Sequence, residues 1–152
     1  MTIFDKLQNG LITDSAEETE SIGVEISLAL PENCALALQG DLGSGKTTLV
    51  RGIARGLGIK AEVTSPTYTI YTIHKGDRQL LHMDAYRLAD AHELDSLAID
   101  EFLESPYLVV VEWPDHIPGF FNEYPSYWIQ LQLMPDQRHE LKLTRFPTSG
   151  KA

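Results

Sequence analysis

Apolar runs and amphipathic segments alternate along the chain and predict a mixture of strands and helices. Residues 34–39 and 107–111 are almost entirely apolar, which is typical of parallel strands buried on both faces of a sheet. Apolar residues at spacings of three and four predict helices over 15–30 and 45–58 and a further helical region over 90–103. Strands that alternate with helices in this way indicate an α/β protein.

Sequence signals mark the ends of two of these helices. Ser15 and Glu18 predict a capping box, in which the Ser15 hydroxyl accepts from the N–H of Glu18 and the Glu18 carboxylate reaches back. Pro31 is expected to stop the first helix before the strand at 34–39. Gly58 lies where a residue in the left-handed conformation would end the second helix.

Alternating apolar and polar residues predict two antiparallel strand pairs. The first is a β-hairpin with its turn near Gly76, and the second is a terminal pair. They cover residues 69–74 with 79–84 and residues 127–133 with 140–144. Residues 1–14 are poorly periodic and predict no more than an edge strand or a short lead-in, and residues 147–152 are expected to form a frayed tail.

Length and composition predict a single domain over residues 1–152 that needs no disulfide or structural metal. The one cysteine, Cys34, lies in an apolar strand, where we interpret it as a small hydrophobe, and this cysteine usage fits a reducing cytoplasm. The sequence contains no run of about twenty apolar residues, so it predicts no membrane-spanning helix. The net charge of −10 disfavours independent binding to nucleic acid, since an acidic surface repels phosphate.

The strongest functional signal follows the first apolar strand. Residues 40–47 fit the phosphate-binding pattern Gly-x-x-x-x-Gly-Lys-[Ser/Thr] at every required position. The glycines let backbone N–H groups point inward, and the following helix adds the positive end of its dipole. Lys46 would reach the β- and γ-phosphates, and the Thr47 hydroxyl would ligate Mg²⁺. The predicted nucleotide contacts of this segment are Asp41, Leu42, Gly43, Ser44, Gly45, Lys46, Thr47 and Thr48.

Two acidic residues close predicted strands. Glu112 ends the strand at 107–111, and an apolar strand tipped by an acid is the Walker B arrangement, whose acid meets the Mg²⁺ shell or the attacking water. Thr47 and Glu112 are therefore the predicted metal ligands. Asp84, at the end of the hairpin, would assist Mg²⁺ or orient water, or is a solvated strand-end aspartate. Trp113 would pack or stack near the nucleotide, or pack in the core or at the rim.

Three further polar positions leave alternatives open. Thr67 lies in a hydroxyl-rich segment around Pro66, which is either a switch that senses the γ-phosphate or a proline turn that enters a strand. His82 is interpreted as a packed or hydrogen-bonded histidine, because no second His or Cys lies nearby at a metal-ligand spacing. Arg87 would pair with a carboxylate or with phosphate.

Several nucleotide enzymes share the phosphate loop, so other motifs must separate them. The guanine-specifying Asn-Lys-x-Asp motif is absent, which disfavours a GTPase, and the Leu-Ser-Gly-Gly signature of transporter ATPases is absent too. A small-molecule P-loop kinase would have an arginine-rich lid, whereas the arginines here are scattered. The kinase remains an alternative.

Four motifs in order resemble the bacterial TsaE family, also called YjeE. They are the loop at 40–47, Thr-Ser-Pro-Thr-Tyr at 64–68, His-Met-Asp-Ala-Tyr-Arg-Leu at 82–88 and Glu-Trp-Pro at 112–114. The resemblance spans about residues 15–145, and the segment 92–103 is similar to the acidic helix of the family. Ala98 departs from the pattern, because the family has a glycine there.

The resemblance implies a P-loop NTPase-like three-layer fold, with a mostly parallel central sheet and antiparallel additions. It also implies a cytoplasmic ATPase that uses ATP and Mg²⁺ and works with TsaD-like and TsaB-like proteins. These proteins make threonylcarbamoyladenosine at position 37 of tRNAs that read codons beginning with A, and the ATPase meets tRNA only through the complex. Lys46, Asp84 and Glu112 would be the catalytic residues, and Thr67 the γ-phosphate sensor.

Hydrolysis by the isolated chain is expected to be slow, because no arginine finger is evident in the sequence. The alternative from the non-enzyme class is a nucleotide-gated assembly module whose ATP state controls complex formation without essential turnover.

Overall fold

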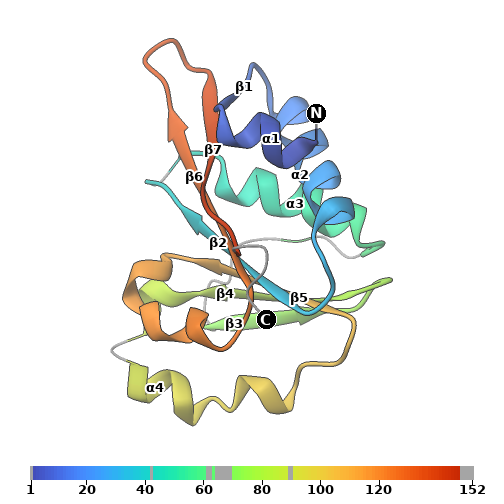
Figure 1. Ribbon diagram of the computed structural model, residues 1–152, viewed down its shortest axis with the longest axis vertical. Helices are drawn as coiled ribbons and strands as arrows, with labels where there is room; N and C mark the ends of the chain where they lie inside the picture. The colour runs from blue at the N-terminus through green and yellow to red at the C-terminus, as the bar shows by residue number, and fades with distance from the viewer. Residues whose placement is uncertain (1, 42, 61–62, 64–69, 89–90, 148–152) are drawn as a thin grey trace.

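The computed structural model describes residues 2–41, 43–60, 63, 70–88 and 91–147. This part of the chain forms a seven-stranded sheet in the order β1-β7-β6-β2-β5-β4-β3 (Figure 1). The strands are β1 (Leu11–Thr13), β2 (Cys34–Gln39), β3 (Tyr71–His74), β4 (Gln79–Asp84), β5 (Tyr107–Glu112), β6 (Ser126–Leu133) and β7 (His139–Arg145).

The centre of the sheet is parallel and its edges are antiparallel. Strand β2 pairs in parallel with β5 and β6, and β4 pairs in parallel with β5. Strand β3 is antiparallel to β4 at one edge, while β7 and β1 extend the other edge in antiparallel fashion. The predicted fold class, both buried strands and both antiparallel pairs are confirmed.

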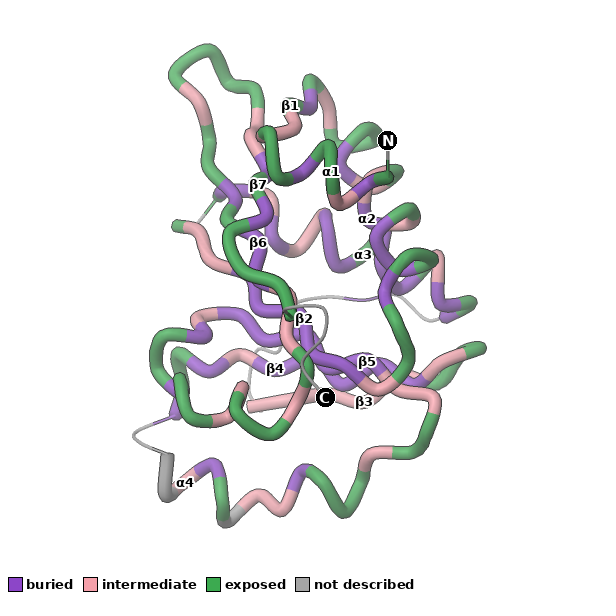
Figure 2. Tube along the Cα trace, viewed as in Figure 1, coloured by how far each residue is buried: buried purple, intermediate pink, exposed green. Residues whose placement is uncertain are grey.

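Helices cover both faces of the sheet, so the fold has three layers. Helices α1 (Ile3–Gln8), α2 (Ala16–Ala29) and α3 (Lys46–Gly56) lie together on one side, and α4 (Ala91–Ser96) lies on the other (Figure 1). A separate hydrophobic cluster fills the space on each side. Figure 2 shows the buried positions gathered along β2, β4 and β5. Among the described residues, no helix has the length and apolar character needed to cross a bilayer.

The N-terminal segment is more ordered than its sequence indicates. The predicted edge strand exists as β1, but the helix α1 precedes it and was missed. The Thr2 hydroxyl accepts from the N–H of Asp5 at 3.1 Å, and the Asp5 carboxylate accepts from the N–H of Thr2 at 3.0 Å. A helix of six residues is too short to show a convincing apolar period, so its capping box was its only clear signal.

The predicted helix boundaries are confirmed with one change. Ser15 caps α2 by accepting from the N–H of Glu18 at 3.1 Å. The Glu18 carboxylate reaches one residue further back than a capping box requires, to the N–H of Asp14 at 2.8 Å. At the end of α3, Gly58 has a φ of +78°, and the N–H of Ile59 binds the carbonyl of Ala54 at 3.0 Å.

Helices α2 and α3 pack backbone against backbone. A Cβ atom at Gly52 of α3 would lie 2.1 Å from the carbonyl oxygen of Glu20 in α2, and one at Gly23 would lie 2.5 Å from the carbonyl oxygen of Leu49. Only glycine permits such close approach. This packing fixes the position of α3, whose first residues belong to the phosphate loop.

The helical region predicted over 90–103 is divided into two short helices. Helix α4 ends at Ser96, and a separate 3₁₀ helix covers Ile99–Glu101. Between them Ala98 adopts the left-handed conformation, with φ of 49° and ψ of 45°. This conformation ends a helix, and the resemblance had led us to expect a glycine there.

We predict that Ala98→Gly raises the free energy of unfolding by about 0.5 to 1 kcal/mol, because relief of left-handed strain exceeds the added entropy of the unfolded chain. The matched control is Ala16→Gly at an exposed position in α2, which should lower the free energy of unfolding. Urea denaturation of both variants measures the two effects. A decrease for Ala98→Gly would contradict the assigned strain.

Candidate functional site

The phosphate loop connects the end of β2 to the start of α3. At Gly40 a Cβ atom would lie 2.6 Å from both the Leu131 carbonyl oxygen and the Ser44 Oγ atom, so this position requires glycine. Gly45 caps α3 in the left-handed conformation with φ of 103° and places no side chain over the first turn. The N–H groups that begin a helix lack partners within the helix and form an anion site. The backbone therefore provides the geometry that the motif predicts.

A histidine far away in sequence supports this loop. His139 begins β7, and its Nδ1 atom lies 2.9 Å from the carbonyl oxygen of Ser44. Because a carbonyl oxygen only accepts, Nδ1 carries the proton. The Ser44 side chain is buried, and its Oγ atom has no hydrogen-bond partner in the described part of the chain. Sequence reasoning missed His139, because only the pairing of β7 with β6 brings it to the loop.

Lys46 is folded back inside the site. Its side chain is buried, its Nζ atom donates to the Gly40 carbonyl oxygen, and Nζ lies 4.1 Å from the centroid of the Trp113 ring. Burial lowers the pKa of Lys46, while Glu112, Asp84 and Asp41 act in the opposite direction. Trp113 is half-buried, and the face of its indole ring contacts the ammonium group of Lys46.

Asp84 and Glu112 lie side by side at the carboxyl ends of parallel strands. They are partners in the register between β4 and β5. The carboxylate of Glu112 is nearly buried, and its Oε2 atom lies 2.6 Å from Nε2 of His82. His82 is thus hydrogen-bonded, as predicted. The Asp84 carboxylate accepts from the N–H of Tyr86 at 3.1 Å and lies 3.5 Å from Nε of Arg87, so Arg87 pairs with a carboxylate.

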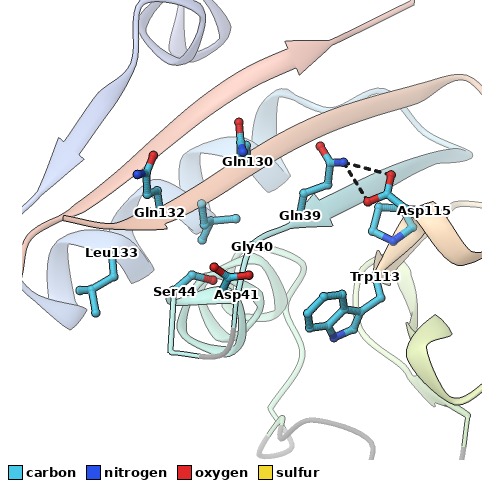
Figure 3. Close-up of a pocket in the computed structure, with 11 residues that line it drawn as sticks. Gln39, Gly40, Asp41, Ser44, Trp113, Asp115, Gln130, Gln132 and Leu133 are labelled. Carbon is cyan, nitrogen blue, oxygen red and sulfur yellow. Dashed lines mark hydrogen bonds between the residues drawn. The ribbon is translucent and has the colours of Figure 1, made fainter. Parts of the chain in front are cut away.

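A cavity of about 600 Å³ adjoins the loop, a size that suits a small ligand. Figure 3 shows Asp41 and Ser44 of the loop, the Trp113 indole beside them, and polar side chains of β2 and β6. Gln39 donates to both carboxylate oxygens of Asp115 at 3.2 Å. The sequence motifs pointed to none of the additional polar lining residues, which are Gln39, Asp115, Gln130 and Gln132.

The oxygen atoms of two site residues are of the kind that binds magnesium. Thr47 offers a hydroxyl in the first turn of α3, and Glu112 offers a carboxylate at the end of β5. Mg²⁺ prefers such hard oxygen ligands and normally completes its shell with phosphate oxygens and water. No cluster of three or more His, Cys, Asp or Glu residues within the described ranges forms an all-protein metal site.

The other predicted contacts divide into two groups. Gly43 and Thr48 lie in the loop and in the first turn of α3, next to the residues described above. Leu42 and Thr67 lie outside the described residues, so the contact assigned to Leu42 and the sensing role assigned to Thr67 stay predictions.

Comparison with known proteins identifies the family. The family model described as "Threonylcarbamoyl adenosine biosynthesis protein TsaE" matches residues 13–143. The chain belongs to the TsaE family. This match agrees with the extent of the resemblance seen in the motifs, about residues 15–145.

Relatives in the TsaE family are similar over much of the chain. The TsaE protein of Treponema pallidum, named a tRNA threonylcarbamoyladenosine biosynthesis protein, is 35% identical over 130 residues, which are 86% of this chain and 96% of the relative. The TsaE protein of Bacillus subtilis is 41% identical over 102 residues, covering 66% of this chain and 63% of the relative.

A solved structure shows the same architecture. The crystal structure of Bacillus subtilis YdiB matches with a TM-score of 0.72 and 30% sequence identity, over 90% of this chain and 84% of that one. Membership of the TsaE family therefore rests on both sequence and fold.

Proposed function

We propose that this TsaE-family chain binds ATP with Mg²⁺ and hydrolyses it in the machinery that makes threonylcarbamoyladenosine at position 37 of tRNA. The observation that carries the proposal is the burial of Lys46 in the phosphate loop. There the negative charges of Glu112, Asp84 and Asp41 act to raise the pKa of Lys46, against the effect of burial. A buried loop lysine with acidic side chains near enough to act on its pKa suits a site that binds a polyphosphate and a divalent cation.

Each residue has a role in this proposal. The loop N–H groups and Lys46 hold the phosphates, and the incoming phosphates replace the contacts of Lys46 with Gly40 and Trp113. Thr47 and Glu112 would hold Mg²⁺, which neutralises phosphate charge when bound. Asp84 would help to place the metal or the attacking water.

We further propose that TsaD-like and TsaB-like proteins complete the site. Arg87 contacts Asp84, and Arg78 donates to backbone carbonyls at the opposite end of β4, including that of Pro31 at 2.7 Å. Arg87 is thus paired with a carboxylate, and Arg78 is held by backbone carbonyls. The chain would act in the cytoplasm and meet tRNA only through its partners, which suits its net charge of −10.

The test is to measure ATP turnover by the chain alone and with the TsaD and TsaB proteins. Turnover should be slow alone and rise with the partners, by about 1,000-fold where a partner supplies an arginine to the transition state. Lys46→Ala in the same mixture controls for contaminating ATPases. Equal and rapid turnover without partners would contradict partner dependence.

The partner assignment has a separate test, in which the immobilised chain captures the TsaD and TsaB pair in the presence of ATP or ADP. Capture that depends on the nucleotide would support both the partners and the switch. No capture with either nucleotide would contradict the assignment.

A further inference from the structure

The buried pair of His82 and Glu112 joins two neighbouring strands at the site. His82 lies in β4 and is fully buried, and its register partner in β5 is Val110. Glu112 lies two residues further along β5, opposite Asp84. The bond from Nε2 of His82 to Oε2 of Glu112 therefore runs diagonally across the sheet, over 2.6 Å.

The two ring nitrogens of His82 differ in their hydrogen bonding, and the difference indicates that the histidine acts on Glu112. Nδ1 is buried and has no hydrogen-bond partner in the part of the chain that the structure describes. A buried polar atom without a partner lowers stability, so filling the core does not explain a histidine at this position. Within the described residues, the ring makes one hydrogen bond, to the carboxylate of Glu112.

We propose that His82 is a positioning residue that holds the Glu112 carboxylate in the orientation it needs toward the magnesium–nucleotide complex. The inference rests on the function proposed above. The Nε2 proton engages one carboxylate oxygen, restricts rotation of the group and leaves the other oxygen available for metal or water. Hydrogen bonds to ligating carboxylates orient them in this way, and their loss reduces metal affinity or activity by about 10- to 100-fold.

Two amide substitutions separate the hydrogen bond from the volume of the ring. The amide nitrogen of glutamine lies about as far from Cβ as Nε2 of histidine does, whereas asparagine reaches only the position of Nδ1. His82→Asn should therefore lose the bond to Glu112, and His82→Gln should recover it. His74→Asn, on strand β3, is the control for the same change at a half-buried histidine that contacts Thr72 at 3.2 Å.

The kinetic readout is ATP turnover with the partner proteins present. His82→Asn should lower kcat by about 10- to 100-fold, while ATP affinity measured without Mg²⁺ should change by less than about threefold, because the phosphate loop is untouched. The kcat of His82→Gln should remain within about fivefold of the kcat of the unmodified chain, and the kcat of His74→Asn should equal that of the unmodified chain. Equal losses in the Asn and Gln variants would overturn the proposal, as would full activity in His82→Asn.

Two readouts do not depend on turnover. The first is ATP affinity with and without Mg²⁺, whose difference should shrink in His82→Asn and persist in His82→Gln. The second is the imidazole NMR spectrum of the unmodified, nucleotide-free chain, which should show His82 protonated at Nε2 with a strongly downfield proton. The resonance of that proton should shift in Glu112→Gln. If the unmodified chain shows no such downfield proton, the proposal is overturned even when the variants fail to fold. An unmodified chain that never hydrolyses ATP would contradict the proposed function, while these readouts would still decide the role of His82.

Discussion

Replacing Glu112 with glutamine is expected to lower ATP turnover at least about 100-fold, while ATP affinity measured without Mg²⁺ changes by less than about threefold. Glu112 ends β5 beside Asp84, and its negative charge acts to raise the pKa of Lys46. Glutamine keeps the shape of the side chain, and its amide oxygen can still accept from His82. The change therefore removes the negative charge and leaves the packing intact.

Single-turnover hydrolysis with the partner proteins measures this effect separately from product release. Glu101→Gln is the matched control, because Glu101 is exposed and lies in the 3₁₀ helix that follows α4. Unchanged turnover in Glu112→Gln would remove Glu112 from the proposed catalytic residues.

The same substitution approach distinguishes the enzyme from the assembly module. If Glu112→Ala abolishes turnover but still supports tRNA modification, hydrolysis is dispensable and the nucleotide controls assembly alone. If modification is lost together with turnover, hydrolysis is part of the function.

Gly52→Ala should destabilise the fold by about 3 kcal/mol, at the upper end of the usual cost of overpacking. The new Cβ would lie 2.1 Å from the carbonyl oxygen of Glu20, and this neighbour belongs to the backbone of α2 and cannot rotate away. The two helices must move apart, which displaces α3 and the phosphate loop at its start. A loss of this size is a large part of a typical domain's stability, which is about 5 to 15 kcal/mol.

Urea denaturation and ATP affinity should both report this displacement. Gly119→Ala is the control, because a Cβ at Gly119 meets no atom within 4 Å, and its free energy of unfolding should change by less than about 0.5 kcal/mol. If Gly52→Ala retained the stability of the unmodified chain, the close packing of α2 on α3 would be contradicted.

Features with local causes could be predicted from the chain. The apolar run at 34–39, the glycines and lysine of the phosphate loop and the ending at Gly58 act over a few residues, and the structure confirms each. The register of β4 with β5 brings Asp84 beside Glu112, which explains why acids that end separate strands mark one site. Their catalytic roles stay predictions.

The misjudged elements had weak or conflicting local signals. Helix α1 has only six residues, so it shows no clear apolar period, and its capping box is the one signal that marks it in the sequence. The segment 90–103 keeps a helical pattern, yet the left-handed Ala98 divides it. A pattern of apolar positions reports which side of a segment is buried, and it does not report the conformation of one residue.

The sequence alone indicated the family, the two central apolar strands with the helices on either side of the phosphate loop, and the residues of that loop, because these depend on neighbours in the chain. The tertiary structure decided that Lys46 lies against Trp113, that His139 is hydrogen-bonded to Ser44, and that His82 is hydrogen-bonded to Glu112. The last two contacts join residues 95 and 30 positions apart, and the order and register of the strands brings them together. Periodicity along one segment carries no information about which strand lies beside it.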